Sequence, residues 1–253
     1  MTGYVNPLKA AVTDGRILRG AWCASPSAVI AEAIASVGYD YVCVDLQHGA
    51  VDYADAVHMF AMISAQGATP IARVASNDAA AIGRVIDAGA LGIVVPLVDN
   101  ASQAERAVAA TRYPPRGNRS YGPIRGSLAV GSREPIDLEQ IFVAVMVETQ
   151  SGLDFVDEIA ASPDVDAIYC GPADLALALG LPPAYERTEQ VHIDAIETIR
   201  KACETHGIIA GVHCVGGEMA ARRVAQGFTM TTIMQDVGTV KAAAAAELAI
   251  AIG

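Results

Sequence analysis

Short runs of β-branched and other apolar residues alternate with longer alanine-rich segments of helical period along the whole chain. This alternation is typical of β-α-β units, which build a parallel sheet. It predicts strands at residues 17–23, 41–45, 70–74, 92–96, 143–148, 165–170, 208–213 and 228–234. The intervening helices are predicted at residues 27–37, 53–66, 79–88, 102–111, 153–160, 189–206, 218–226 and 239–252. Eight strands and eight helices favour a closed (β/α)8 TIM barrel over an open doubly wound sheet.

The length agrees with one such barrel. A (β/α)8 domain typically needs about 250 residues, and the chain has 253, of which 53% are hydrophobic and 18% charged. No segment is rich enough in proline, serine or charge to act as a linker. We therefore expect residues 1–253 to form a single domain.

Charge and cysteine usage restrict the partners and the compartment. Lysine and arginine number 17 against 28 aspartate and glutamate residues, a net charge of -11, so we expect neither a nucleic acid nor an acidic membrane as partner. The 5 cysteines lack paired spacing and are predicted to be buried free thiols in a reducing compartment. Because the first residues lack the apolar core of a signal peptide and no run could span a membrane, we expect a cytoplasmic protein.

Polar residues at the predicted strand ends are candidates for a site, because (β/α)8 barrels carry catalysis at the carboxyl ends of their strands. Asp45, Arg73, Glu148 and His213 lie at or near such ends, and Asp174 follows the sixth strand. Glu148 comes directly after an apolar run, where a charge is costly unless it is paired or ligating. An internal ion pair of Arg73 with a carboxylate is one interpretation. The other is a hard divalent cation held by Glu148 and Asp174.

Several chemistries lack their residues. The 3 lysines, Lys9, Lys201 and Lys241, all lie away from the strand ends, so no candidate exists for a Schiff base. A carbonyl would then have to be polarised by a metal ion or by Arg73. The sequence has neither a glycine-rich nucleotide cradle nor a zinc motif, although His48 and His213 leave zinc open.

Five segments carry a family resemblance: GAWCASPSAVIAEAIASVGYDYVCVDLQHG at 20–49, ARVASND at 72–78, RVIDAGALGIVVPLVDNASQAERAVAATRYPPRGNRSYGP at 84–123, MVET at 146–149 and YCGPADLALALG at 169–180. In this order they are highly specific. The chain resembles the HpcH/HpaI family of metal-dependent class II pyruvate aldolases, typified by 4-hydroxy-2-oxoheptane-1,7-dioate aldolase. The resemblance implies a barrel of the phosphoenolpyruvate/pyruvate-binding type and covers nearly the whole chain.

The resemblance also implies roles for individual residues. Glu148 and Asp174 look like the ligands of a divalent metal ion, Mg²⁺, Mn²⁺ or Co²⁺. Arg73 looks like the residue that binds the substrate and steadies the enolate oxygen. His48 and Asp87 look like a proton-transferring dyad.

Further residues have supporting roles in this interpretation. The backbone N–H groups of Ala173 and Asp174 are expected to hold the pyruvate carboxylate. Asp45 is expected to orient Arg73 or a metal-bound water rather than to bind the ion. The chain departs from the family at Gln47, where glutamate is frequent, and at Met146, where glutamine is frequent. These departures put the working pH and the preferred substrate in question.

The reaction that the resemblance implies is reversible cleavage of a 4-hydroxy-2-oxo acid into an aldehyde and pyruvate, or a related 2-oxo acid such as hydroxypyruvate. Two alternatives stay open from the sequence. The same site could support an oxaloacetate decarboxylase-like or acyl-CoA lyase-like activity. The barrel could also bind a keto acid without turnover.

The sequence also bears on the oligomeric state and on the long connection at 113–139. By resemblance, the chain forms a homo-oligomer, a hexamer built as a trimer of dimers, with the helix at 239–252 exchanged between neighbours. An alanine-rich helix that caps its own barrel fits the composition equally well. The polar connection at 113–139 is expected to be a functional loop whose Arg119 and Arg125 suit an acidic aldehyde, and the sequence does not fix the face of the barrel it reaches.

Overall fold

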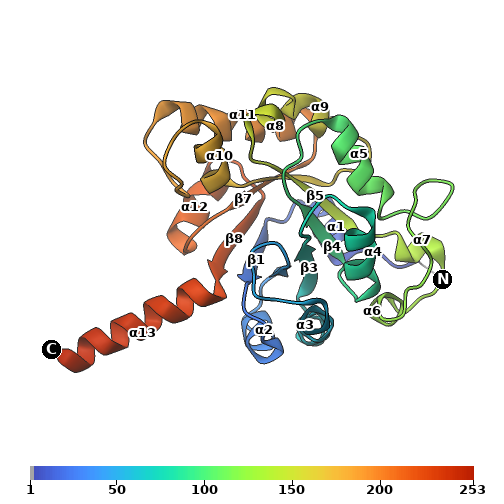
Figure 1. Ribbon diagram of the computed structural model, residues 1–253, viewed down its shortest axis with the longest axis horizontal. Helices are drawn as coiled ribbons and strands as arrows, with labels where there is room; N and C mark the ends of the chain where they lie inside the picture. Colours follow the sequence, from blue (N-terminus) through green and yellow to red (C-terminus); the bar gives the residue numbers. More distant parts are fainter. Residues whose placement is uncertain (1–2) are drawn as a thin grey trace.

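In the computed structural model, which describes residues 3–253, eight parallel strands close into a barrel in sequence order (Figure 1). The strands are β1 (Leu18–Cys23), β2 (Tyr41–Asp45), β3 (Thr69–Arg73), β4 (Gly92–Val95), β5 (Phe142–Val147), β6 (Ala167–Cys170), β7 (Ile209–His213) and β8 (Met230–Gln235). Each predicted strand matches one of these within two residues at both ends. The predicted (β/α)8 barrel is confirmed.

Helices follow each strand around the outside of the barrel. They are α2 (Ala28–Ala35), α3 (Tyr53–Ala65), α4 (Ala79–Asp87), α5 (Ala101–Ala109), α8 (Gln150–Asp154), α9 (Val156–Ala160), α10 (Pro172–Ala178), α11 (Gln190–His206), α12 (Gly217–Ala225) and α13 (Asp236–Ile252). Ser27, Asp52, Asp78 and Asn100 begin four of them, each accepting a backbone N–H in its side-chain oxygen. Such capping explains why these helices begin where they do. The helix predicted at 153–160 is divided between α8 and α9.

The core has two layers, one between strands and helices and one inside the barrel. Inside, two glycines make room for two buried tyrosine rings. A Cβ built on Gly20 would lie 2.1 Å from the ring of Tyr41, and one on Gly211 would lie 2.8 Å from that of Tyr169. Because side chains alternate along a strand, the inward register that starts with these residues continues to the polar residues at the carboxyl ends.

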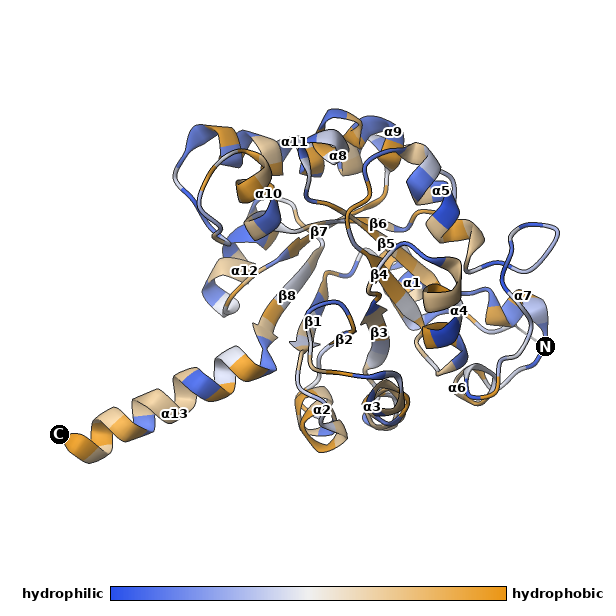
Figure 2. Ribbon diagram, viewed as in Figure 1, coloured by the Kyte–Doolittle hydropathy of each residue, from blue (hydrophilic) through white to orange (hydrophobic). Residues whose placement is uncertain are grey.

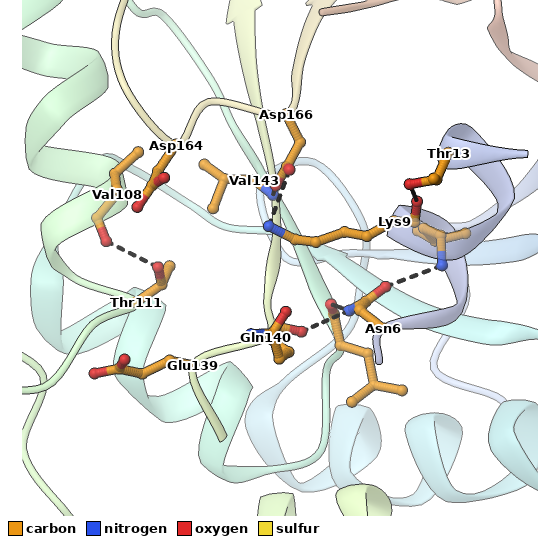
Figure 3. A network of polar contacts seen from close by, with 12 residues as sticks. Asn6, Lys9, Thr13, Val108, Thr111, Glu139, Gln140, Val143, Asp164 and Asp166 are labelled. Carbon is orange, nitrogen blue, oxygen red and sulfur yellow. Dashed lines mark hydrogen bonds and ion pairs between the residues drawn. The ribbon is translucent and has the colours of Figure 1, made fainter. Parts of the chain in front are cut away.

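The amino-terminal opening of the barrel is covered by α1 (Pro7–Thr13), a helix that the sequence analysis did not predict. Asn6 is fully buried and caps this helix by accepting the N–H of Leu8. Its amide donates to the carbonyls of Leu91 and Gln140, both at 2.7 Å, just ahead of β4 and β5. Lys9 adds an ion pair to Asp166 at 2.9 Å (Figure 3). Helix α1 has 7 residues, of which only Leu8 and Ala11 are buried. Its sequence is therefore too short to show the amphipathic pattern by which a helix is predicted.

The connection at 113–139 lies at this same end of the barrel and contains α6 (Gly126–Val130) and α7 (Pro135–Leu138). Its two ends are joined through Glu139, which accepts the backbone N–H of Tyr113 at 2.6 Å and, at its carbonyl, a bond from Arg112 at 2.8 Å. Two of its tyrosine rings, those of Tyr113 and Tyr121, also pack together at 5.4 Å. The connection, whose position the sequence does not fix, therefore reaches the amino-terminal face of the barrel.

Helix α13 projects away from the barrel rather than packing over it (Figure 1). Its apolar residues run along its whole length (Figure 2), yet Asp236 in the first turn is the one residue of the helix that is buried. Leu248 and Ile250 are 61% and 76% exposed. The interpretation of this helix as a cap on its own barrel is wrong, because it leaves the barrel directly from β8.

We expect Asn6→Ala to lower the free energy of unfolding by about 2–4 kcal/mol, because it removes a helix cap and leaves two buried carbonyls without a hydrogen-bond donor. Urea unfolding followed by circular dichroism measures the change. Thr13→Ala is the matched control, since its hydroxyl donates to the Lys9 carbonyl in the exposed last turn of α1. Equal stability of the two variants would contradict the role given to Asn6.

Candidate active site

A cavity of about 240 Å³ opens at the carboxyl ends of the strands. Seven of the residues singled out from the sequence line it: Asp45, His48, Arg73, Met146, Ala173, Asp174 and His213. The remaining lining residues are Trp22, Ala24, Gly171, Pro172, Tyr185 and Gln235. The polar strand ends thus converge on one space, as the barrel topology requires.

Arg73 is held at the cavity by Asp45, its register partner on the neighbouring strand. The carboxylate accepts from Nε at 2.9 Å and from Nη2 at 2.5 Å, a bidentate pair. It also accepts the backbone N–H of His48 and the indole N–H of Trp22. Burial acts to raise the pKa of Asp45, but the bonds to Arg73 outweigh it and the pKa lies below its usual value. Asp45 therefore remains ionised and fixes the guanidinium.

Glu148 lies buried beside Gly171 and is only half satisfied by the protein. Its Oε1 accepts the backbone N–H of Leu97 at 3.0 Å, while its Oε2 is buried and has no partner among the described residues. Desolvation, together with the negative charge of Asp174, raises the pKa of Glu148 from 4.5 to about 7. A buried carboxylate oxygen without a partner is costly unless a cation or a proton occupies it.

Two backbone features set the surroundings of the two oxygens of Glu148. A Cβ on Gly171 would lie 2.2 Å from Glu148 Oε2, so only glycine leaves the space free. Leu97 adopts φ 55, a left-handed conformation that is unfavourable for a side-chain-bearing residue, and its N–H reaches the other oxygen. Strain of this kind persists where the surroundings demand a particular geometry.

Asp174 and Ala173 lie in the first turn of α10, which Pro172 begins. The helix's first backbone bond runs from Leu175 to Gly171, so the N–H groups of Ala173 and Asp174 have no acceptor within the helix. Buried His192 holds this turn through a 2.9 Å contact with the Pro172 carbonyl. Asp174 itself is exposed to the cavity.

The donor set suits a hard cation rather than zinc. Within residues 3–253 no group of three or more histidine, cysteine, aspartate or glutamate side chains is gathered for a metal ion. Zinc sites usually take at least three protein ligands, whereas Mg²⁺ is typically bound by one or two carboxylates with water and substrate. Glu148 and Asp174 fit the second pattern.

The dyad of His48 with Asp87 is not formed within one chain. His48 lies on the exposed loop after β2, at the cavity. Asp87 is the last residue of α4, and its carboxylate pairs with Arg119 at 2.7 Å. The reason is topological: a helix that follows a parallel strand returns to the amino-terminal end of the barrel, so its last residue lies far from the mouth.

The connection at 113–139 likewise contributes no residue to the cavity of its own chain. Arg119 is 3% exposed and is engaged by Asp87 and by the Leu138 carbonyl. Within its own chain, Arg119 is therefore not available to meet an acidic aldehyde at the cavity.

The sequence did not lead us to the wall residues Trp22, Tyr185 and Gln235, whereas His213, which it singled out at a strand end, does line the cavity. The inward register of β1 signals Trp22, whereas nothing in the sequence signals Tyr185, which comes from the segment between α10 and α11. Of the two family departures, Met146 lines the cavity and Gln47 has a buried Oε1 without a partner among the described residues.

The chain matches the family model described as HpcH/HpaI aldolase/citrate lyase over residues 18–243. The chain belongs to this family. It is 34% identical over 241 residues to hydroxypyruvate/pyruvate aldolase of Rhizorhabdus wittichii, a match that covers 95% of this chain and 96% of that one. It is 32% identical to 2-keto-3-deoxy-L-rhamnonate aldolase of Escherichia coli, covering 91% of this chain and 87% of the relative.

Among solved structures, an HpcH/HpaI aldolase/citrate lyase family protein from Burkholderia cenocepacia superposes with a TM-score of 0.89. That match has 29% identity and covers 98% of this chain and 100% of that chain. The predicted family, the barrel and the enzyme class, an aldehyde-lyase, are confirmed. No helix within residues 3–253 is long and apolar enough to cross a bilayer.

The raised pKa of Glu148 predicts a pH-dependent stability in chelator-treated protein. Between pH 4.5 and about 7 the folded chain keeps a proton that the unfolded chain has released, so stability falls as pH rises. Glu148→Gln removes this loss and should raise the free energy of unfolding by about 1–3 kcal/mol at pH 8, with a small difference at pH 5. Urea titrations at both pH values measure it, and a difference that does not change with pH would contradict the burial argument.

Proposed function

We propose that this chain is a metal-dependent aldolase that reversibly cleaves a 4-hydroxy-2-oxo acid into an aldehyde and pyruvate or hydroxypyruvate. The observation that carries the proposal is the buried, unpartnered Oε2 of Glu148, which adjoins Gly171 in the wall of a cavity that Asp174 and Arg73 also line. These two carboxylates would hold Mg²⁺, Mn²⁺ or Co²⁺. When bound, such an ion would draw electron density from a 2-oxo acid and so make the hydrogens on its third carbon more acidic.

Arg73 supplies the second positive charge of the site. Its Nε and Nη2 each donate to Asp45, which leaves Nη1 with both of its hydrogens for a substrate oxygen. A donor that is already oriented loses little free energy when charge develops on the keto oxygen. The free N–H groups of Ala173 and Asp174 would receive the carboxylate of the 2-oxo acid.

His48 is the proposed group for proton transfer at the aldehyde oxygen. An imidazole can serve as acid or base, and the backbone N–H of His48 is anchored to Asp45 at 3.2 Å. In this proposal Asp87 would orient His48 only from a neighbouring copy of the chain. Gln47 stands where a charged glutamate is frequent, so the surroundings of His48 carry less negative charge. Met146 stands where a neutral glutamine is frequent, so the cavity wall loses a hydrogen-bonding group there.

The exposed apolar length of α13 supports a homo-oligomer, for which we propose the hexameric arrangement of a trimer of dimers. The exposed residues Val240, Leu248 and Ile250 would be covered if α13 packs on a neighbouring barrel. We further propose a cytoplasmic location, since a reducing compartment suits the five free and buried cysteines.

The test is an aldehyde panel incubated with pyruvate or hydroxypyruvate and Mn²⁺. We expect metal-dependent aldol addition by the wild type and losses of about 10³-fold or more in kcat/KM for Glu148→Ala and Asp174→Ala, because each removes half of the ligand set. Product formation is followed by chromatography, and circular dichroism checks that both variants fold. Wild-type turnover by either variant would rule out the ligand assignment.

A further inference from the structure

His213 ends β7, the strand next to β6, and lines the cavity between two aromatic rings. Its ring stacks on Tyr185 at 5.4 Å and meets the ring of Trp22 edge-on at 5.1 Å. Burial and the positive charge of Arg73 lower the pKa of His213 to about 4, so the imidazole is neutral at physiological pH. A neutral imidazole has one N–H donor and one acceptor nitrogen.

A chain of hydroxyl groups inside the barrel decides which nitrogen carries the hydrogen. Tyr41 Oη lies 3.2 Å from Thr232 Oγ1, which lies 2.5 Å from Tyr169 Oη, which in turn lies 3.3 Å from Nδ1 of His213. Tyr41, Thr232 and Tyr169 are fully buried, with 0% of their surface exposed. Each of the three hydroxyls has one hydrogen to donate.

Only one direction along this chain uses every hydrogen. If Tyr41 donates to Thr232, Thr232 to Tyr169 and Tyr169 to Nδ1 of His213, all three hydroxyl hydrogens have acceptors. In the reverse direction the hydroxyl hydrogen of Tyr41 would have no acceptor among the described residues, and a buried unsatisfied donor is costly. His213 therefore accepts at Nδ1 and carries its hydrogen on Nε2, the nitrogen left for a ligand.

The oxygens of a plain 2-oxo acid already have partners in the proposed function, on which this inference rests. The ion, Arg73 and the first turn of α10 would take the keto and carboxylate oxygens, and His48 would serve the aldehyde oxygen. A further hydrogen-bond donor at the cavity, the Nε2–H of His213, has a use only when the substrate has a further oxygen. Pyruvate has none, whereas hydroxypyruvate has a hydroxyl on its third carbon.

We propose that His213 is a specificity-determining residue whose Nε2–H donates to the 3-hydroxyl of a hydroxylated 2-oxo acid. Trp22 and Tyr185 would flank that hydroxyl and restrict water, so the bond would not have to compete with solvent. Tyr169 is the positioning residue, because its hydroxyl fixes the tautomer of His213. A site that donates to a substrate hydroxyl discriminates strongly against the analogue that lacks it.

The test measures hydrogen–deuterium exchange at the third carbon of hydroxypyruvate and of pyruvate by proton NMR. The protein is activated with Mn²⁺, no aldehyde is present, and a chelator stops the reaction. We expect His213→Leu to lower the ratio of kcat/KM for hydroxypyruvate to that for pyruvate by about 10- to 100-fold. Tyr169→Phe should lower the ratio less, since it frees the tautomer without removing the imidazole. His58→Leu, a substitution of an exposed histidine on α3, is the matched control and should leave the ratio unchanged.

Each other outcome overturns the inference. Equal losses of kcat/KM for hydroxypyruvate and for pyruvate in His213→Leu would mean that His213 has a structural role only. An unchanged exchange ratio together with a loss confined to additions of hydroxylated aldehydes would assign the bond to the other substrate. Absence of metal-dependent exchange in the wild type would remove the proposed function itself, and exchange with an unaltered ratio in His213→Leu would remove this inference alone.

A second readout does not depend on turnover. Nitrogen-15 NMR of histidine-labelled protein should show an unprotonated Nδ1 and a protonated Nε2 for His213, assigned with the His213→Leu variant. Tyr169→Phe should shift that signal toward a mixture of tautomers. A protonated Nδ1 in the wild type would reverse the hydroxyl chain and overturn the inference.

Discussion

The half-satisfied carboxylate of Glu148 is the constraint around which the mouth of this barrel is arranged. One oxygen is held by the strained backbone of Leu97, and the other is kept open because residue 171 is glycine. Burial and Asp174 both oppose its ionisation. A divalent cation would reverse this cost, because it replaces repulsion between two carboxylates with attraction of both to one charge.

Elsewhere at the mouth, most hydrogen-bonding groups are already paired within the protein. Asp45 is saturated by Arg73, Trp22 and two backbone N–H groups, so it orients the arginine and has little capacity left for an ion. The hydroxyl chain from Tyr41 ends at His213. What remains free at the cavity is one guanidinium nitrogen, one imidazole N–H, two backbone N–H groups and the acidic pair, a set that suits a small anion with several oxygens.

Much of this could be predicted from the sequence, because strand periodicity fixes which residues point inward. The predicted strands end at or next to Asp45, Arg73, Glu148 and His213 and so place them at the mouth, where the structure has them. The inward register of the first strand could also have placed Trp22. The carboxyl-terminal position of each polar residue was sufficient, since the barrel topology brings all eight strand ends together.

Other features of the fold and the site depend on contacts between residues far apart in the sequence, which no local sequence pattern indicates. The pairing of Asp87 with Arg119 depends on how the connection at 113–139 closes on the amino-terminal end of the barrel. Tyr185 reaches His213 from an irregular segment, and α1 is held by carbonyls far away in the sequence. For α13, composition alone cannot distinguish a helix that caps its own barrel from one that leaves it.

The central claim is that Glu148 and Asp174 together hold one divalent ion, and direct measurement of Mn²⁺ binding by electron paramagnetic resonance tests it without any substrate. We expect one Mn²⁺ per wild-type chain and a rise in Kd of at least about 100-fold for Glu148→Gln and for Asp174→Asn, since each removes one of two charged ligands. Binding of the same stoichiometry and Kd by either variant would contradict it.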